Sequence, residues 1–227
     1  MDRAGVRHDE PVSYVYATAD PESRRLGLDA AASAVRRGEL VVLPTDTAYG
    51  VGTDAFNPHG VASLLAAKAR GRDLPLPVLV GTPGTLDGLT YAVSTPARRL
   101  VEAFWPGALT VVVRHAPSLA WDLGDADGKV ALRMPLHPVA LELLRTTGPM
   151  AVTSANRSGS PVPTTADDAQ DQLGDAVSVY LDAGASPDGL PSTIVDASGE
   201  IPVLLRAGAI DLATLREVCP DLVADDS

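Results

Sequence analysis

Several common signals of location and structure are missing from this chain. It has a single cysteine, Cys219, among 227 residues, so no intramolecular disulfide can form, and a reducing compartment such as the cytoplasm is expected. The longest apolar runs, at residues 40–43 and 109–113, are far too short to cross a bilayer. Residues 1–10 carry charges of both signs and no apolar stretch, unlike a signal peptide. We therefore expect no membrane association.

Signatures of the common catalytic classes are also missing. The chain has no G-x-x-x-x-G-K-[ST] phosphate loop, no G-x-G-x-x-G and no G-x-S-x-G. Its four histidines lie far apart, without the spacing of metal ligands: His8, His59, His115 and His137. The sequence therefore predicts no covalent nucleophile and no metal ion held by protein side chains.

Positive charge and aromatic residues are scarce. Lys and Arg number 18 against 29 Asp and Glu, which gives a net charge of -11, and aromatic residues make up 4 %. Proteins that hold nucleic acid tightly usually present a basic face, often interleaved with aromatic side chains. We expect weak or no direct binding of nucleic acid.

The composition otherwise fits one α/β domain over residues 1–227, since 45 % of residues are hydrophobic and 21 % charged. Predicted helices alternate with predicted strands, and some intervals, such as 196–202, are too short for a crossover helix. This favours a twisted mixed sheet flanked by helices. The helices are expected at 21–39, 58–70, 94–105, 138–146, 165–173 and 212–218. The strands are expected at 40–43, 78–80, 109–113, 130–133, 150–153, 177–181, 192–195 and 203–205.

The remaining segments show no helical or strand pattern. Residues 1–20 are expected to form an extended arm, and the acidic tail at 221–227 is expected to fray. The loops at 81–90, 114–129 and 183–191 are rich in Gly, Pro and Asp and are predicted to be mobile lids.

Groups that bind phosphate or carboxylate follow several of these elements. Residues 45–47, Thr-Asp-Thr, come directly after a buried strand, where side chains face the crevice of an α/β sheet, although they can also simply cap a turn. Lys68, Arg70 and Arg72 place three cations at the end of a helix. The helix dipole alone favours cations there, but a Gly-bearing loop with three of them also suits a triphosphate.

Further polar residues stand at the ends of later strands. Arg133 closes the strand at 130–133, and a buried Arg there requires an anionic partner, from the protein or from a ligand. Ser154 and Asn156 follow the next strand in a turn that can form an anion nest. Ser192 and Arg206 come at the start and the end of the last two strands.

The order and spacing of these motifs resemble the YrdC family, the threonylcarbamoyl-AMP synthases, over residues 25–210. The motifs are Pro44-Thr-Asp-Thr-Ala-Tyr-Gly, Lys68-x-Arg70, Trp105-Pro-Gly-Ala-Leu-Thr, Leu132-Arg-Met-Pro-x-His-Pro, Ser154-Ala-Asn-x-Ser-Gly, Pro191-Ser-Thr-Ile-Val-Asp and Leu205-Arg206-x-Gly. The resemblance is to the short form of the family, and it implies a YrdC-like fold with a concave cationic cavity.

The resemblance implies a reaction and its partners. L-threonine and bicarbonate or CO2 form a carbamate, whose oxygen attacks the α-phosphorus of ATP to give threonylcarbamoyl-AMP and diphosphate. Mg2+ is expected on the ATP. A tRNA threonylcarbamoyltransferase complex then uses the adenylate to make N6-threonylcarbamoyladenosine in tRNA.

The resemblance also implies residue roles. The residues expected to hold threonine are Thr47, Arg133 and Ser192, with Arg133 bidentate to the carboxylate. The residues expected to hold the phosphates and ribose of ATP are Lys68, Arg70, Ser154, Asn156 and Arg206. Catalysis is expected from positioning, and from charge stabilisation by Lys68 and Arg70.

This chain departs from the family pattern at several positions. At five positions this chain has a different residue from the one that relatives often have. It has Gly71 in place of Pro, Leu74 in place of Asn, Leu79 in place of His, Lys129 in place of Thr or Ser, and Val162 in place of Ser. Because the His faces threonine in relatives, Leu79 bears on amino-acid affinity and identity. Two alternatives stay open: an enzyme that forms a simple carbamoyl-adenylate, and an RNA-binding or ribosome-maturation protein.

Overall fold

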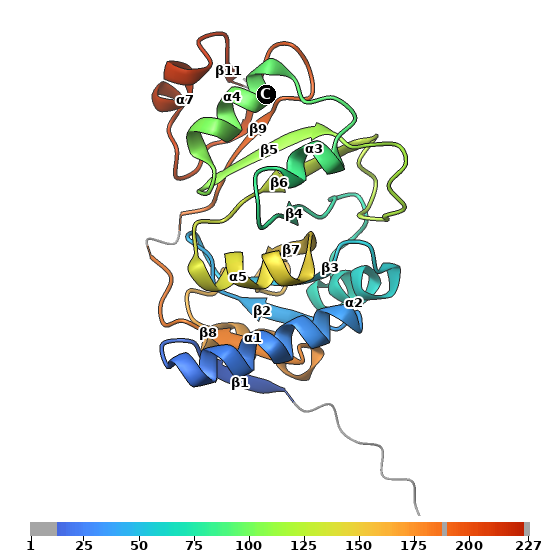
Figure 1. Ribbon diagram of the computed structural model, residues 1–227, viewed down its shortest axis with the longest axis vertical. Coiled ribbons are helices and arrows are strands. Elements are labelled where there is room, and N and C mark those ends of the chain that lie inside the picture. Colours follow the sequence, from blue (N-terminus) through green and yellow to red (C-terminus); the bar gives the residue numbers. More distant parts are fainter. Residues whose placement is uncertain (1–12, 188–189, 225–227) are drawn as a thin grey trace, which may run out of the picture.

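A mixed sheet of eleven strands runs through the molecule (Figure 1). The computed structural model describes residues 13–187 and 190–224. The strand order is β1-β8-β2-β3-β7-β4-β6-β5-β9-β10-β11. The strands are β1 (Tyr14–Ala17), β2 (Val41–Leu43), β3 (Gly50–Asp54), β4 (Val78–Leu79), β5 (Leu109–Arg114), β6 (Lys129–Arg133), β7 (Met150–Ser154), β8 (Val179–Asp182), β9 (Thr193–Asp196), β10 (Val203–Arg206) and β11 (Val223–Ala224).

Helices connect many of these strands and begin at recognisable caps. They are α1 (Pro21–Arg36), α2 (Pro58–Lys68), α3 (Thr85–Leu89), α4 (Thr95–Phe104), α5 (Pro138–Thr147), α6 (Ala166–Leu173) and α7 (Leu212–Val218), with a 3-10 turn at Gly174–Ala176. Asp20, Asn57 and Ser94 each accept a hydrogen bond from a backbone N–H of the first turn of α1, α2 and α4. The helices α1, α2, α4 and α5 have Pro in the first turn, where its missing N–H costs no hydrogen bond.

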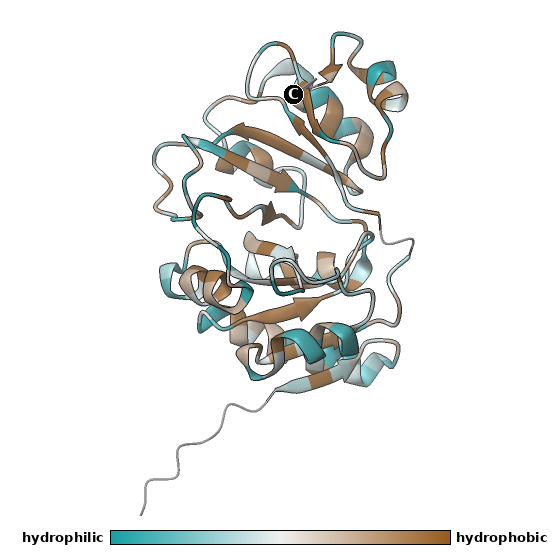
Figure 2. Ribbon diagram, turned by 180° about the vertical axis from the view of Figure 1, so that it is seen from behind, coloured by the Kyte–Doolittle hydropathy of each residue, from teal (hydrophilic) through white to brown (hydrophobic). Residues whose placement is uncertain are grey.

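Two hydrophobic clusters lie on the two faces of the sheet. The smaller one joins α1 and α5 to β2, β7, β8 and Leu79 of β4, and the larger one includes residues of α2, α4 and α6. Figure 1 shows α1 and α5 side by side near β2 and β8. Figure 2 shows hydrophobic colour concentrated on the strands and hydrophilic colour on outward turns of the helices.

One end of the sheet lacks cover by α1 and α5. In β6, Val130 and Leu132 face the larger cluster, so Arg133 points to the opposite face, the face of its paired neighbour Leu79. Among the described residues, no member of the smaller cluster comes from β5, β6 or β9. In the part of the chain that the structure describes, the hydrophobic packing under α1 and α5 therefore does not extend to β5, β6 or β9.

The structure corrects the sequence prediction at four places. The strand β3 was not predicted, although all but the last of its residues are buried. A Cβ on Gly52 would lie 2.5 Å from Val152 Cγ2 and 2.6 Å from the Ala151 oxygen, so glycine is needed where β3 approaches β7. Because glycine has no hydrophobic side chain, the strand gives no apolar pattern.

The other three corrections concern the predicted arm, lid and tail. The described part of the predicted arm contains β1, which pairs with β8, and the predicted lid at 81–90 contains α3, whose Leu86 and Leu89 are buried. In the predicted tail, Leu222 is buried and β11 pairs with β10, so fraying is wrong for 221–224. Residues 225–227 lie outside the described residues, as do 1–12 of the arm and 188–189 of the third loop.

Candidate active site

Arg133 is a buried cation held by three protein groups. It is 7 % exposed, and its Nη2 forms an ion pair with Asp46 Oδ1 at 2.6 Å. Its Nη1 donates to Thr47 Oγ1 at 2.8 Å and its Nε to the Gly107 oxygen at 3.0 Å. Burial lowers the pKa of Arg133, and Asp46 opposes that effect. A guanidinium carries five N–H donors, so one donor on each Nη is left for a ligand.

Thr45 and Thr47 have different tasks in the loop before β3. Thr45 Oγ1 donates to the Ala48 oxygen at 2.6 Å and accepts from the backbone N–H groups of Thr47 and Ala48 at 3.2 Å each. Thr45 therefore closes the turn, as expected of a Thr that caps. Thr47 is thereby turned toward Arg133, with its hydroxyl 3.1 Å from that of Thr45.

Ser192 lies at the start of β9 and is also buried, with 8 % exposed. Its Oγ is 2.8 Å from Thr110 Oγ1 and accepts from Arg206 Nη2 at 3.0 Å. The backbone oxygen of Ser192 accepts two further hydrogen bonds from Arg206, from Nη2 at 2.7 Å and from Nε at 3.1 Å. Since Val111 of β5 pairs with Leu132 of β6, Thr110 lies opposite Arg133 in the sheet. The charge of Arg206 also lowers the pKa of Arg133, so the two cations lie close enough to repel each other.

Lys68, which the sequence predicts at the phosphates, is buried inside the protein. It is 2 % exposed, and its Nζ donates to the backbone oxygens of Ser154 and Asn156 at 2.5 Å each. It also donates to Asn156 Oδ1 at 3.1 Å. These acceptors engage all three N–H donors of an ammonium. Burial, and secondly the charge of Arg70, lower the pKa of Lys68 to about 8.

Asn156 is engaged in the same way. Its Nδ2 donates to the Arg157 and Ser160 oxygens at 3.0 and 2.8 Å, and only 7 % of the residue is exposed. Ser154 is less buried, and its Oγ lies 3.4 Å from Lys68 Nζ. In this conformation Lys68 and Asn156 shape the turn after β7, while Ser154 presents its hydroxyl near it.

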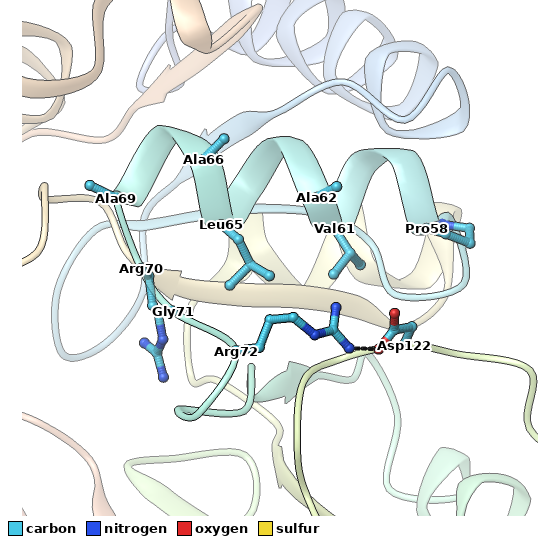
Figure 3. A pocket seen from close by; sticks show the side chains of 10 residues that line it. All are labelled: Pro58, Val61, Ala62, Leu65, Ala66, Ala69, Arg70, Gly71, Arg72 and Asp122. Carbon is cyan, nitrogen blue, oxygen red and sulfur yellow. Dashed lines mark hydrogen bonds and ion pairs between the residues drawn. The ribbon is translucent and has the colours of Figure 1, made fainter.

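Arg70 follows α2 and has a more open position. Its Nη1 donates to Thr153 Oγ1 at 3.3 Å, and its Nε and Nη2 donate to the Leu74 and Pro75 oxygens at 3.0 and 3.2 Å. Burial lowers its pKa. A cavity of about 560 Å³ lies along α2, with Arg70, Arg72 and Asp122 at its edge (Figure 3). Arg70 lines this cavity, and so does Arg72, the third cation that the sequence offers for a triphosphate, whose Nη2 pairs with Asp122 Oδ1.

The structure therefore divides the predicted residues into two groups. The first comprises Thr47, Arg133, Ser192 and Arg206; the second comprises Lys68, Arg70, Ser154 and Asn156. Arg206 was predicted with the second group but contacts Ser192 of the first. Sequence analysis did not single out Thr110, and it gave Asp46 no partner; the signal for Asp46 was its place between two motif threonines.

The positions that depart from the family pattern are accommodated in different ways. Leu79 is 5 % exposed and belongs to the smaller hydrophobic cluster. Lys129 Nζ pairs with Asp196 Oδ2 at 2.9 Å. Leu74 and Val162 are 57 % and 49 % exposed. An apolar residue at 79 is therefore used in packing.

Two kinds of feature are absent from the described residues. Within 13–187 and 190–224, no three His, Cys, Asp or Glu side chains are grouped so that they could hold a metal ion. Within the same ranges, no helix combines the length and the apolar character that crossing a membrane requires.

Known proteins are similar to this chain in sequence and in fold. The Sua5/YciO/YrdC family model, described as "Telomere recombination", matches residues 33–208. A Mycobacterium tuberculosis protein, named provisionally as a threonylcarbamoyl-AMP synthase, is 58 % identical over 200 residues, which are 88 % of this chain and 92 % of that protein. The Bacillus subtilis threonylcarbamoyl-AMP synthase is 38 % identical over 86 % of this chain and 57 % of its own.

A solved structure agrees with these matches. The crystal structure of Pyrococcus abyssi Sua5 in complex with L-threonine superposes with a TM-score of 0.86 and 30 % identity, over 94 % of this chain and 62 % of that one. The motifs read from the sequence, the mixed sheet and these relatives agree on one assignment. The chain belongs to the Sua5/YciO/YrdC family.

Proposed function

We propose that this protein is a threonylcarbamoyl-AMP synthase, which uses ATP as a substrate and makes the adenylate needed for N6-threonylcarbamoyladenosine in tRNA. The relatives at 58 % and 38 % identity support this activity. The observation that carries the site assignment is Arg133, a buried cation with two free N–H donors beside two hydroxyl-bearing residues, Thr47 and Ser192.

We assign threonine to the group around Arg133. The two free donors on Nη1 and Nη2 suit the two oxygens of the α-carboxylate, which a guanidinium binds bidentately. Thr47 on one side, and the Ser192–Thr110 pair on the other, offer hydroxyls to the ammonium and the side-chain hydroxyl of threonine. Loss of one proton from the ammonium to solvent gives the neutral amine, which attacks CO2 or bicarbonate.

We assign the ATP phosphates to the space between this group and Arg70. Arg70 and Arg206 supply charge, Ser154 a hydroxyl, and Lys68 and Asn156 hold the turn that presents Ser154. The resulting cavity is concave and cationic on the uncovered face of β5, β6 and β9. Mg2+ would be carried by phosphate oxygens and add charge neutralisation there.

The reaction then needs no covalent enzyme intermediate. The neutral amine of threonine bonds to the carbon of CO2 and loses one proton to solvent to give the carbamate; with bicarbonate, a water molecule leaves instead. A carbamate oxygen then bonds to the α-phosphorus of ATP while the bond from that phosphorus to diphosphate breaks. The cations stabilise charge that builds on the leaving diphosphate, and burial limits hydrolysis of the carbamate. We expect the adenylate to pass to a cytoplasmic tRNA threonylcarbamoyltransferase complex, with little direct binding of tRNA by this chain.

Diphosphate release from ATP tests the proposal when threonine and bicarbonate are omitted in turn. We expect release that requires both compounds, with serine and valine as poor substitutes. Release without threonine, with a nitrogen-bearing carbamoyl donor such as carbamoyl phosphate supplied instead, would indicate a carbamoyl-adenylate enzyme. No release, together with salt-sensitive RNA binding, would indicate an RNA-binding protein.

A further inference from the structure

The hydroxyl of Ser192 has a limited set of hydrogen bonds to make. A hydroxyl has one proton to donate and two lone pairs that accept. Arg206 Nη2 donates to Ser192 Oγ at 3.0 Å, and a guanidinium has no acceptor, so this contact occupies one lone pair. Arg206 is kept in place because its Nε and Nη2 also donate to the backbone oxygen of Ser192. One lone pair and the proton of Ser192 remain for other partners.

Thr110 is the second partner of this hydroxyl. It lies in β5, the neighbour of β9 in the sheet, and its Oγ1 is 2.8 Å from Ser192 Oγ. Thr110 is 4 % exposed, and within residues 13–187 and 190–224 its hydroxyl has no other hydrogen-bond partner. If Ser192 were the donor of this bond, the proton of Thr110 would be buried without an acceptor, which costs free energy. The burial of Thr110 therefore favours Thr110 as the donor.

This direction of the bond limits what Ser192 can offer to a ligand. With Arg206 and Thr110 both donating to its oxygen, the two lone pairs of Ser192 are occupied and only its proton is left. Ser192 can then donate to a bound molecule but cannot accept from it. Such a hydroxyl favours a ligand atom with a free lone pair and disfavours a ligand atom that only donates.

Threonine has an atom of the favoured kind. In the proposed site its carboxylate binds Arg133, and Thr110 lies opposite Arg133 in the sheet, so the amino acid lies beside the Ser192–Thr110 pair. The oxygen of its side-chain hydroxyl has lone pairs that can accept the Ser192 proton. An amino acid of the same shape with an ammonium group at that position would instead meet a donor with a donor.

We propose that Thr110 is a positioning residue that determines specificity: its hydroxyl donates to Ser192 and thereby leaves Ser192 as a donor to the side-chain hydroxyl of threonine. This inference rests on the proposed function and concerns how the same site chooses its amino acid. Thr110 acts through Ser192 and does not touch the substrate. The link between them is a direct hydrogen bond, with no intervening segment of the chain.

The test is Thr110→Val, which keeps the shape of the side chain and removes the donor. The freed lone pair lets Ser192 accept as well as donate, so the variant should tolerate a donor in the ligand. The probe is 2,3-diaminobutyrate in its fully protonated form, in which an ammonium replaces the threonine hydroxyl. Calorimetric titration gives the dissociation constants of both compounds. We expect the ratio of the diaminobutyrate constant to the threonine constant to fall by about tenfold in Thr110→Val.

Two matched variants control this measurement. Thr110→Ser keeps the donor and should retain the wild-type ratio. Thr90→Val makes the same chemical change at another buried threonine, whose hydroxyl donates to the Leu86 oxygen at 2.8 Å. Thr90 pairs with His115, beyond the end of β5 that lies away from Thr110. Thr90→Val should lower the Tm without changing the ratio, because a general loss of stability does not favour one ligand over the other.

The outcomes separate this inference from the proposed function. An unchanged ratio in Thr110→Val, or an equal fall in Thr110→Ser or Thr90→Val, would overturn the role of Thr110. If the wild type does not bind threonine, or releases diphosphate without it, the proposed function fails instead. Should Thr110→Val not fold, Thr110→Cys replaces the hydroxyl by a thiol, which is a weak donor. Its ratio should also fall, and a wild-type ratio in that variant would overturn the inference.

Discussion

Replacing Asp46 by Asn isolates the charge that balances Arg133. Asp46 Oδ1 accepts from Arg133 Nη2 at 2.6 Å and from the Leu136 N–H at 2.9 Å, and an Asn oxygen can accept both bonds. The side chains of Arg133 and Asp46 are 8 % and 14 % exposed, so water screens this pair little. The Asp46→Asn protein would therefore keep the shape of the pair while Arg133 lies buried without a counter-ion.

The expected loss of stability follows from this geometry. A hydrogen bond to a charged group contributes about 1.5–3 kcal/mol, and breaking a buried pair outright costs about 3–5 kcal/mol. Because Asn retains the acceptor, we expect a loss of about 2–3 kcal/mol, or roughly 4–12 °C in Tm for a domain of this size. Glu142→Gln is the matched control. The Arg24–Glu142 pair has the same 2.6 Å distance but is 31 % and 53 % exposed, so its loss should stay below about 1 kcal/mol.

Threonine should partly reverse the effect of Asp46→Asn. If the α-carboxylate binds Arg133, it supplies the missing negative charge, and ligand binding to the folded state raises Tm. Calorimetry with and without threonine should show a larger increase for Asp46→Asn than for the wild type. The reasoning is refuted if Asp46→Asn is no less stable than Glu142→Gln, or if threonine stabilises the variant less than the wild type.

Three further changes test the assignment of the cations. Arg133→Ala should raise the threonine KM by an amount that corresponds to about 1.5–3 kcal/mol, while the ATP KM changes less; unchanged threonine dependence would contradict the role of Arg133. Arg70→Ala should raise the ATP KM, and an equal rise in the threonine KM would count against separate subsites. Lys68 has a pKa of about 8, so its charge is present below pH 8 and is lost above it, and the ATP KM should rise as the pH passes 8. The pKa of Lys68 in the folded state lies below the ordinary 10.5, so between pH 8 and 10.5 the unfolded state binds more protons than the folded state. The contribution of Lys68 to the free energy of unfolding therefore rises with pH in this range. Lys68→Met should lack both pH dependences in kinetics and in denaturation, and a variant that keeps them would contradict this prediction.

The sequence predicted most strands because their apolar residues form short continuous runs. The run at 40–43 became β2, and that at 109–113 became β5, since buried strands of this kind need no other signal. The strand β3 has no such apolar run, because it has Gly50 and Gly52 at positions where side chains would collide with β7. Its packing requirement is steric and depends on a strand that lies far away in the sequence.

The candidate site was predictable in composition but not in grouping. Motifs marked Thr47, Arg133, Ser192 and Lys68 as polar residues at the ends of elements. They could not indicate that the Lys68 ammonium would meet backbone oxygens 86 and 88 residues away. A lysine whose N–H donors are all bonded to the protein cannot be told from one with free donors by sequence, because every residue has a backbone oxygen that can accept.

The Leu79 position shows how a departure from a family pattern is explained by packing. Leu79 pairs with Arg133 across β4 and β6, next to the site, yet it is 5 % exposed among the residues under α5. A polar side chain buried there would need a hydrogen-bond partner within an apolar cluster. Leu79 removes that requirement, and in the proposed site recognition of the amino acid is left to Arg133 and the hydroxyls of Thr47, Thr110 and Ser192. A site that recognises its ligand through hydroxyls discriminates by leaving them unpaired when the ligand lacks a partner group. Specificity for a hydroxyl-bearing amino acid is therefore compatible with an apolar residue at this position.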